Sequence, residues 1–292
     1  MPTWVLVALV GAVVIAAVAW RMAGRRNPDI DLGRAAKAAD LAVPDELQGD
    51  LLRRMQVRLR LRAAGVAILC ALLWIWAVTV FSLDSTRFEA ALLLVPWLIV
   101  GLFAAVGIWT LAFAESRVSP DRLRTLGHLP RLGLTSLVSP LEVAIAAGAA
   151  LWPALVVLGC TVVGTPAKPP ATAWAVVSVM WVAFGVGLAA WTARLPLRGA
   201  SVVELAWNDV LRGLAVRAIL RTVAASSCAA GLAVATLLPR WRNYDFVEFA
   251  VVTSLFVLPI GAASVLDALG KSRVHATRWR ANFAVPAESA VS

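Results

Sequence analysis

The chain has 292 residues, of which 61% are hydrophobic and 15% charged, and its formal net charge at pH 7 is +10. Soluble domains average about 45–50% apolar and about 25% charged residues, so the composition excludes an ordinary soluble fold. A net positive charge can indicate nucleic-acid binding, but here the distribution of the basic residues favours a role in membrane topology and no nucleic-acid partner.

The hydrophobic residues gather in blocks about as long as the 20 residues that a helix needs to cross a bilayer. Alternating ten-residue segments, which are typical of membrane barrels, are absent from the sequence. We therefore predict an all-α integral membrane protein, a bundle of about seven transmembrane helices. The predicted helices are 3–20, 64–82, 90–113, 141–163, 172–193, 219–238 and 247–269.

The basic residues lie mainly in every second segment that connects or follows these hydrophobic blocks. If the N-terminus is outside, the inner segments carry 23 of the 27 Lys and Arg residues and the outer segments carry 4. Because Lys and Arg accumulate on the cytoplasmic side, this bias predicts an N-out, C-in topology. An alternative is a cleaved signal peptide ending at Ala17-Val18-Ala19, but the sequence lacks the basic residues that precede such signals.

This topology divides the chain into four parts. They are a first transmembrane helix and uncleaved signal anchor at 1–20, a basic cytoplasmic loop and lead-in helix at 21–63, a six-helix bundle at 64–269 with cytoplasmic segments at 114–140 and 194–221, and a cytoplasmic tail at 270–292 with a disordered end.

The first cytoplasmic part combines a polar stretch with a basic helix. The run from Asn27 to Pro44 is punctuated by proline and is expected to be a loop. A helix is predicted from Pro44, with Leu47, Leu51, Leu52, Met55 and Leu59 near one face. Its basic residues could bind anionic lipid or could simply fix the topology. They are Arg53, Arg54, Arg58, Arg60 and Arg62.

A second amphipathic lead-in precedes the sixth block. Ser201 and Glu204 form a predicted capping box. A stripe of Val203, Trp207, Val210 and Leu214 is predicted to lie at the membrane interface, opposite the polar face, with Gly213 as the expected bend. The polar face carries Glu204, Asn208 and Arg212, and Arg217 and Arg221 are expected to reach the headgroups. The segment is either a helix that docks a cytoplasmic partner or an ordinary juxtamembrane helix.

Residues with catalytic chemistry are scarce and scattered. The two histidines, His128 and His275, lie far apart, and the three cysteines occur singly in predicted membrane helices. The sequence contains no zinc-site spacing, phosphate-binding loop or nucleophile elbow. We therefore predict neither an enzyme nor a cofactor or metal site. Glu142 is expected to cap the fourth membrane helix together with Ser139.

A few polar or helix-breaking residues lie inside the predicted bundle. Kinked helices and polar residues can line a transport path, and intramembrane ionisable groups are often functional. The candidates are Pro153, Ser226, Ser227, Glu248, Pro259 and Asp267. For Ser226 and Ser227, helix packing is the simpler interpretation. Asp267 could pair with Lys271, and an inverted repeat of helices two to four and five to seven is a further alternative.

The leading hypothesis is a non-enzymatic subunit or scaffold in a bacterial plasma membrane. Its basic cytoplasmic face would engage a partner protein or anionic lipid, through Arg53, Arg54, Arg58, Arg60, Arg62, Trp207, Arg212, Arg217 and Arg221. The alternative is a transporter or permease component for an apolar or amphiphilic solute.

Overall fold

The computed structural model describes residues 10–18, 21, 27–39, 41–81, 100–102, 104–112, 134–162, 169–195, 202–237 and 246–270. Throughout these ranges the chain forms helices and short connections, with no strand. The predicted all-α class is therefore confirmed for this part of the chain. The tail at 270–292, apart from Gly270, the capping residue Ser201 and the side chains of Arg62 and Glu248 lie outside the described residues.

Three helices are long and apolar enough to cross a membrane, by the length and composition of the described residues. They are the spans Pro140–Val162, Ala171–Arg194 and Val203–Ala235. Shorter apolar helices occur at Val100–Ala112 and Thr253–Leu269. The structure thus shows a candidate multi-pass membrane protein.

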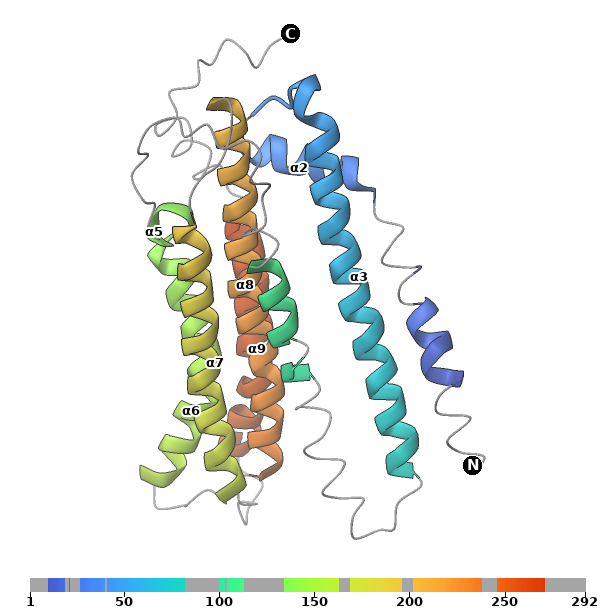
Figure 1. Ribbon diagram of the computed structural model, residues 1–292. Helices are drawn as coiled ribbons and strands as arrows, with labels where there is room; N and C mark the ends of the chain where they lie inside the picture. Colours follow the sequence, from blue (N-terminus) through green and yellow to red (C-terminus); the bar gives the residue numbers. More distant parts are fainter. Residues whose placement is uncertain are drawn as a thin grey trace.

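Four helices pack side by side: α6 (Pro140–Val162), α7 (Pro169–Arg194), α8 (Val202–Leu237) and α9 (Phe246–Gly270). The helix α8 contacts each of the other three (Figure 1) and contributes more residues to the buried core of the bundle than any other helix. A short helix, α5 (Leu134–Leu137), packs against α7 and α8 at one end of this bundle. The helix α8 is therefore the central element around which the others are arranged.

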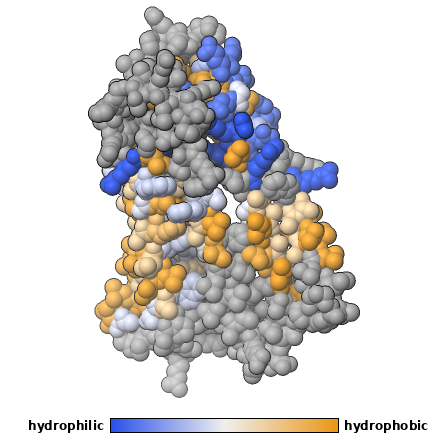
Figure 2. Space-filling model, in the orientation of Figure 1, coloured by the Kyte–Doolittle hydropathy of each residue, from blue (hydrophilic) through white to orange (hydrophobic). Residues whose placement is uncertain are grey.

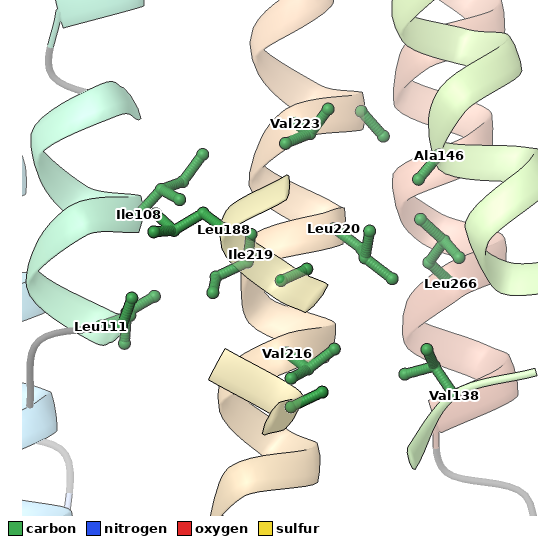
Figure 3. Close-up of a cluster of buried hydrophobic side chains, with 14 of the residues drawn as sticks. Ile108, Leu111, Val138, Ala146, Leu188, Val216, Ile219, Leu220, Val223 and Leu266 are labelled. Atoms are coloured by element: carbon green, nitrogen blue, oxygen red, sulfur yellow. The ribbon is translucent and has the colours of Figure 1, made fainter. Parts of the chain in front are cut away.

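The bundle core is built from aliphatic side chains around α8. Val216, Ile219, Leu220 and Val223 of α8 lie between Leu188 of α7, Ala146 of α6, Leu266 of α9 and Ile108 (Figure 3). Small residues allow the helix backbones to approach each other closely. A Cβ atom on Gly185 would overlap Val223, and one on Gly231 would overlap the backbone carbonyl of Leu255.

The outer surfaces of α6 and α7 carry exposed apolar side chains, which a soluble surface of this extent rarely does. Examples are Leu155, Leu158, Val176, Met180 and Trp191. Figure 2 shows hydrophobic residues along the sides of the described helices and hydrophilic residues gathered at one end. This distribution suits lateral contact with a lipid bilayer.

The hydrophilic end is formed by a separate layer that we call the cap, defined as residues 28–62 and 202–214. It contains α2 (Pro28–Ala39), the beginning of α3 (Asp45–Phe81) and the first third of α8. Its apolar core joins Leu32 and Ala35 of α2 with Leu51 and Met55 of α3 and with Trp207 of α8. The cap therefore brings together two segments that lie about 150 residues apart.

The predicted loop between Asn27 and Pro44 is wrong for most of its length, because α2 is a helix of 12 residues. The side chain of Asn27 accepts a hydrogen bond from the backbone N–H of Asp29 at 3.0 Å. Pro28 occupies the first helical position, where a missing N–H costs nothing, and Asp29 and Asp31 lie in the first turn. The proline thus begins a helix instead of marking a loop.

The helix predicted from Pro44 is confirmed and continues as α3 for 37 residues into the apolar block that follows. The helix α8 is similarly continuous over 36 residues and runs through Gly213 without interruption. The lead-in and the membrane segment of the sixth block are therefore one helix.

Candidate functional site

The most distinctive part of the structure is a series of polar contacts along α8, between the cap and the bundle. Glu204, Asn208, Asp209, Arg212 and Arg217 of this helix are all buried. Buried charged residues are rare unless they are paired, so each of them requires a partner or an explanation.

Trp207 anchors the upper part of this series in the cap. Its side chain is fully buried, and its Nε1–H donates a hydrogen bond to the backbone carbonyl of Ala42 at 3.1 Å. The ring of Trp207 is therefore not available for the predicted contact with lipid or a partner. Its apolar stripe packs on α2 and α3, so the tryptophan is a core residue of the cap.

The polar face of the same helix is covered by α3. Arg54 donates a hydrogen bond from Nη1 to Oδ1 of Asn208 at 2.5 Å, and Arg58 donates one from Nη2 to the carbonyl oxygen of Leu211 at 3.1 Å. Arg54 also forms an ion pair with Asp50, one turn earlier, at 2.8 Å. Two of the five arginines proposed to contact lipid or a partner thus attach α3 to α8, whereas Arg53 and Arg60 remain exposed.

Asp209 and Arg212 follow on the next turn, and both are buried. The burial of Arg212 contradicts the expected exposed polar face. Within the part of the chain that the structure describes, Oδ1 of Asp209 has no hydrogen-bond partner. Arg212 attracts this carboxylate electrostatically.

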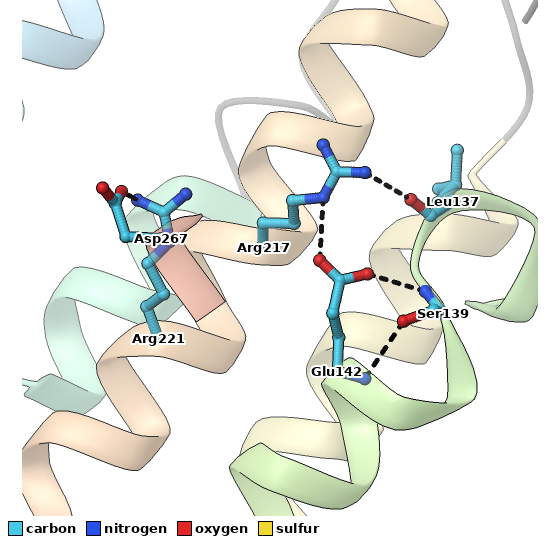
Figure 4. Close-up of polar contacts among 6 residues, drawn as sticks. All are labelled: Leu137, Ser139, Glu142, Arg217, Arg221 and Asp267. Atoms are coloured by element: carbon cyan, nitrogen blue, oxygen red, sulfur yellow. Dashed lines mark hydrogen bonds and ion pairs between the residues drawn. The ribbon is translucent and has the colours of Figure 1, made fainter. Parts of the chain in front are cut away.

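A layer of two ion pairs lies where α8 enters the bundle, and we call it the ion-pair layer. Nε of Arg217 lies 3.3 Å from Oε1 of Glu142, and Nη1 of Arg221 lies 2.5 Å from Oδ1 of Asp267 (Figure 4). The first pair joins α8 to α6 and is almost completely buried, whereas the side chains of the second, which joins α8 to α9, are about a third exposed. Two arginines one turn apart on α8 thus hold two neighbouring helices.

Local structure fixes the Glu142 carboxylate in this layer. The backbone N–H of Ser139 donates to Oε2 of Glu142 at 2.7 Å, and the N–H of Glu142 donates to Oγ of Ser139 at 3.2 Å. This confirms the predicted capping box. The other carboxylate oxygen faces Arg217, which also donates to the carbonyl of Leu137 at 3.3 Å (Figure 4).

The predicted positions of Arg217 and Arg221 require correction. Both are expected to extend toward the headgroups, but each forms an ion pair between helices. Asp267 contacts Arg221, and its predicted pair with Lys271 involves a residue outside the described ones. Sequence reasoning missed both pairs, because their members lie 75 and 46 residues apart.

The two serines proposed for a transport path take part in helix packing. Oγ of Ser227 donates to the carbonyl oxygen of Ala149 in α6 at 3.1 Å, and Oγ of Ser226 accepts from Nε1 of Trp181 in α7 at 2.7 Å. This confirms the packing interpretation for both. Pro153 and Pro259 are buried inside α6 and α9, and Glu248 lies in the first turn of α9.

No group of three or more His, Cys, Asp or Glu residues that could hold a metal ion occurs among the described residues. Cys70, Cys160 and Cys228 are free thiols in three different helices. The polar series on α8 makes hydrogen bonds and ion pairs to α3, α6 and α9.

No protein-family model, curated protein or solved structure matches this chain.

Proposed function

We propose that this chain is a non-enzymatic multi-pass subunit or scaffold of a bacterial plasma membrane. The cap lies on the cytoplasmic side and engages a partner protein or anionic lipid. Seven hydrophobic blocks and the 23 to 4 bias of basic residues support about seven membrane helices with an N-out, C-in topology.

The observation that carries the proposal is the continuity of α8. At 1.5 Å per residue its 36 residues extend about 54 Å, whereas the hydrocarbon core is about 30 Å thick. About 24 Å of the helix therefore extends beyond the core, and this part is held in the cap by Trp207, Asn208 and Leu211. A partner bound to the cap would act directly on the central helix of the bundle.

The outer surface of α2 is the region of the cap that a soluble partner would reach. The side chain of Arg34 is 78% exposed, and Lys37 is also exposed, one turn further along. The inner face of α2 is used by the cap core, through Leu32, Ala35 and Ala39. Arg34 also forms an ion pair with Asp31 at 3.5 Å, and α2 carries Asp29 and Asp31 in its first turn. The outer surface of α2 thus offers two exposed basic side chains, Arg34 and Lys37, to acidic groups of a partner protein.

The charged residues of the series on α8 support a role without catalysis. The Glu142 carboxylate accepts the capping-box hydrogen bond from Ser139 and pairs with Arg217. Arg221 likewise forms an ion pair with a neighbouring helix. A transporter remains the alternative, but Ser226, Ser227 and Asp267 have packing or pairing roles that do not require a solute.

The test is purification of the full chain in mild detergent with native lipids, followed by mass spectrometry of the molecules that remain bound. We expect a stoichiometric soluble partner that is lost when Arg34→Glu and Lys37→Glu are combined. Arg194→Glu, at the exposed end of α7, is the matched control and should retain the partner. A chain that purifies without protein but with a bound amphiphilic solute would contradict the proposal and support the transporter.

A further inference from the structure

The exposed arginines of α3, Arg53 and Arg60, lie on the same face of the helix as Ile68. Ile68 is an exposed residue in the apolar part of α3. Taking 100° per residue, Arg53, Val57, Arg60 and Ile68 fall within an arc of about 80°. Val57 is 44% exposed and Ile68 is 50% exposed. This face of α3 thus changes along the helix from a basic part, with Arg53 and Arg60, to an apolar part with Ile68.

The other faces of this part of α3 are occupied by the protein. Arg54 and Arg58 point to α8, where they meet Asn208 and the carbonyl oxygen of Leu211. Leu51 and Met55 are covered by the cap core. The exposed residues of these turns of the described helix are Arg53, Gln56, Val57 and Arg60, which lie on one face.

The contacts between α3 and α8 also fix the level of these arginines. Both helices run in the same direction, and Arg58 lies beside Leu211. Arg217, in the ion-pair layer, is six residues further along α8, which corresponds to residue 64 of α3. Arg60 therefore lies about 6 Å above the ion-pair layer and Arg53 about 16 Å above it, at 1.5 Å per residue.

This level coincides with the chemistry of a headgroup region. The apolar part of α3 begins after Arg62, and no acidic residue follows Asp50 in the helix. With the ion-pair layer taken as the edge of the hydrocarbon core, the headgroup layer of about 5–8 Å includes the level of Arg60. Arg53 lies about 8 Å beyond this layer, within about one Debye length of the charged surface.

We propose that the face formed by Arg53, Val57 and Arg60 binds the phosphate headgroups of anionic phospholipids. The Arg60 guanidinium binds a phosphate by charge-assisted hydrogen bonds, while Arg53, farther from the core, attracts the anionic surface over a longer range. This inference rests on the proposed function in one respect, that the cap lies beside a membrane. It is independent of whether the cap also binds a partner protein.

The test uses the purified full chain in nanodiscs of phosphatidylcholine, with or without phosphatidylglycerol, and native mass spectrometry of the lipids that remain bound after release. Wild type is expected to retain phosphatidylglycerol in preference to phosphatidylcholine. The combination of Arg53→Gln and Arg60→Gln should lower this preference about 25-fold, about fivefold for each arginine near an anionic surface. Arg60→Glu alone should abolish it.

The matched control combines Arg34→Gln and Lys37→Gln, which removes the same charge from α2, on the opposite face of α3. It should keep the lipid preference within about twofold of wild type, because it leaves the lipid-facing arginines in place. An equal loss in both double variants would overturn the proposal, since net charge alone would then explain retention. Wild type without a preference, or an unchanged preference in Arg60→Glu, would overturn it as well.

The same samples separate this inference from the proposed function. A protein partner that depends on Arg53 and Arg60, without any preference for phosphatidylglycerol, would overturn the lipid site and leave the scaffold intact. Lipid selectivity that depends on Arg53 and Arg60, in a chain that retains no protein, would support the lipid site and count against a docking scaffold.

Discussion

Glu142 and Arg217, at the start of α6 and in the middle of α8, form an ion pair in which the side chains are 1% and 8% exposed. The same carboxylate caps its own helix through Ser139. Glu142 thus satisfies an unpaired N–H group at the start of its own helix. It also provides the negative charge that the buried Arg217 of another helix requires.

Replacing Arg217 by leucine should be strongly destabilising, because the Glu142 carboxylate would remain buried without its cation. We expect a loss of about 3–5 kcal/mol in the free energy of unfolding. Combining Arg217→Leu with Glu142→Gln should recover much of this loss, since glutamine keeps the capping box without a charge. Thermal unfolding of the detergent-purified variants measures both, and equal losses in the single and double variants would contradict the account.

Truncating Trp207 should loosen the packing of α2 and α3 on the first third of α8. Trp207→Ala removes a fully buried indole and should cost about 3–5 kcal/mol, while Trp207→Phe should cost mainly the hydrogen bond to Ala42, about 1 kcal/mol. Limited proteolysis at residues 41–44 reports the opening of the cap. Trp191→Ala, on the exposed side of α7, is the control, and faster cleavage in that variant would argue against a specific role of Trp207.

The helix start of α2 depends on Asn27. Asn27→Ala should remove the bond to the N–H of Asp29 and cost about 0.5–2 kcal/mol, whereas Asn27→Asp should preserve the helix. Hydrogen exchange of the amides in 28–39 is the measurement, with α9 as an internal reference. Unchanged protection of α2 in the alanine variant would show that packing on α3 alone maintains the helix.

The glycines of the bundle should differ sharply in their tolerance of a side chain. Gly231→Ala places Cβ against the backbone of Leu255, which cannot move aside, so we expect a loss of about 1–3 kcal/mol from overpacking. Gly187→Ala is the control, because nothing lies within 4 Å of its Cβ position. Thermal unfolding distinguishes them, and equal effects would mean that α8 and α9 are not in close contact at Gly231.

Local signals in the sequence predicted local structure well. Ser139 and Glu142 lie three residues apart, and their spacing alone specifies the capping box that the structure contains. The helix from Pro44 follows equally from a nearby pattern. The error at α2 is also local, because Pro28 is compatible with either a loop or the first turn of a helix, and only Asn27 before it favours the helix.

The contacts between distant segments could not be predicted. A helical wheel of residues 202–214 correctly places Trp207 and Asn208 on different faces of the helix. It cannot show that Arg54, and not water, contacts Asn208 on the polar face. Likewise, the sequence alone does not distinguish the roles of the five arginines between residues 53 and 62 of α3. Their division into two that hold α8 and two that face outward depends on where another helix lies, about 150 residues later.

The continuity of α8 through the ion-pair layer has a mechanical consequence. The ion pair between Arg217 and Glu142 holds α8 near its middle. Arg217 divides α8 into arms of about 23 Å toward the cap and about 30 Å toward the far end, at 1.5 Å per residue. Because the far arm is itself packed on α6 and α9, through Ser227 and Gly231, a sideways force on the cap end would load those contacts at the opposite end of the bundle.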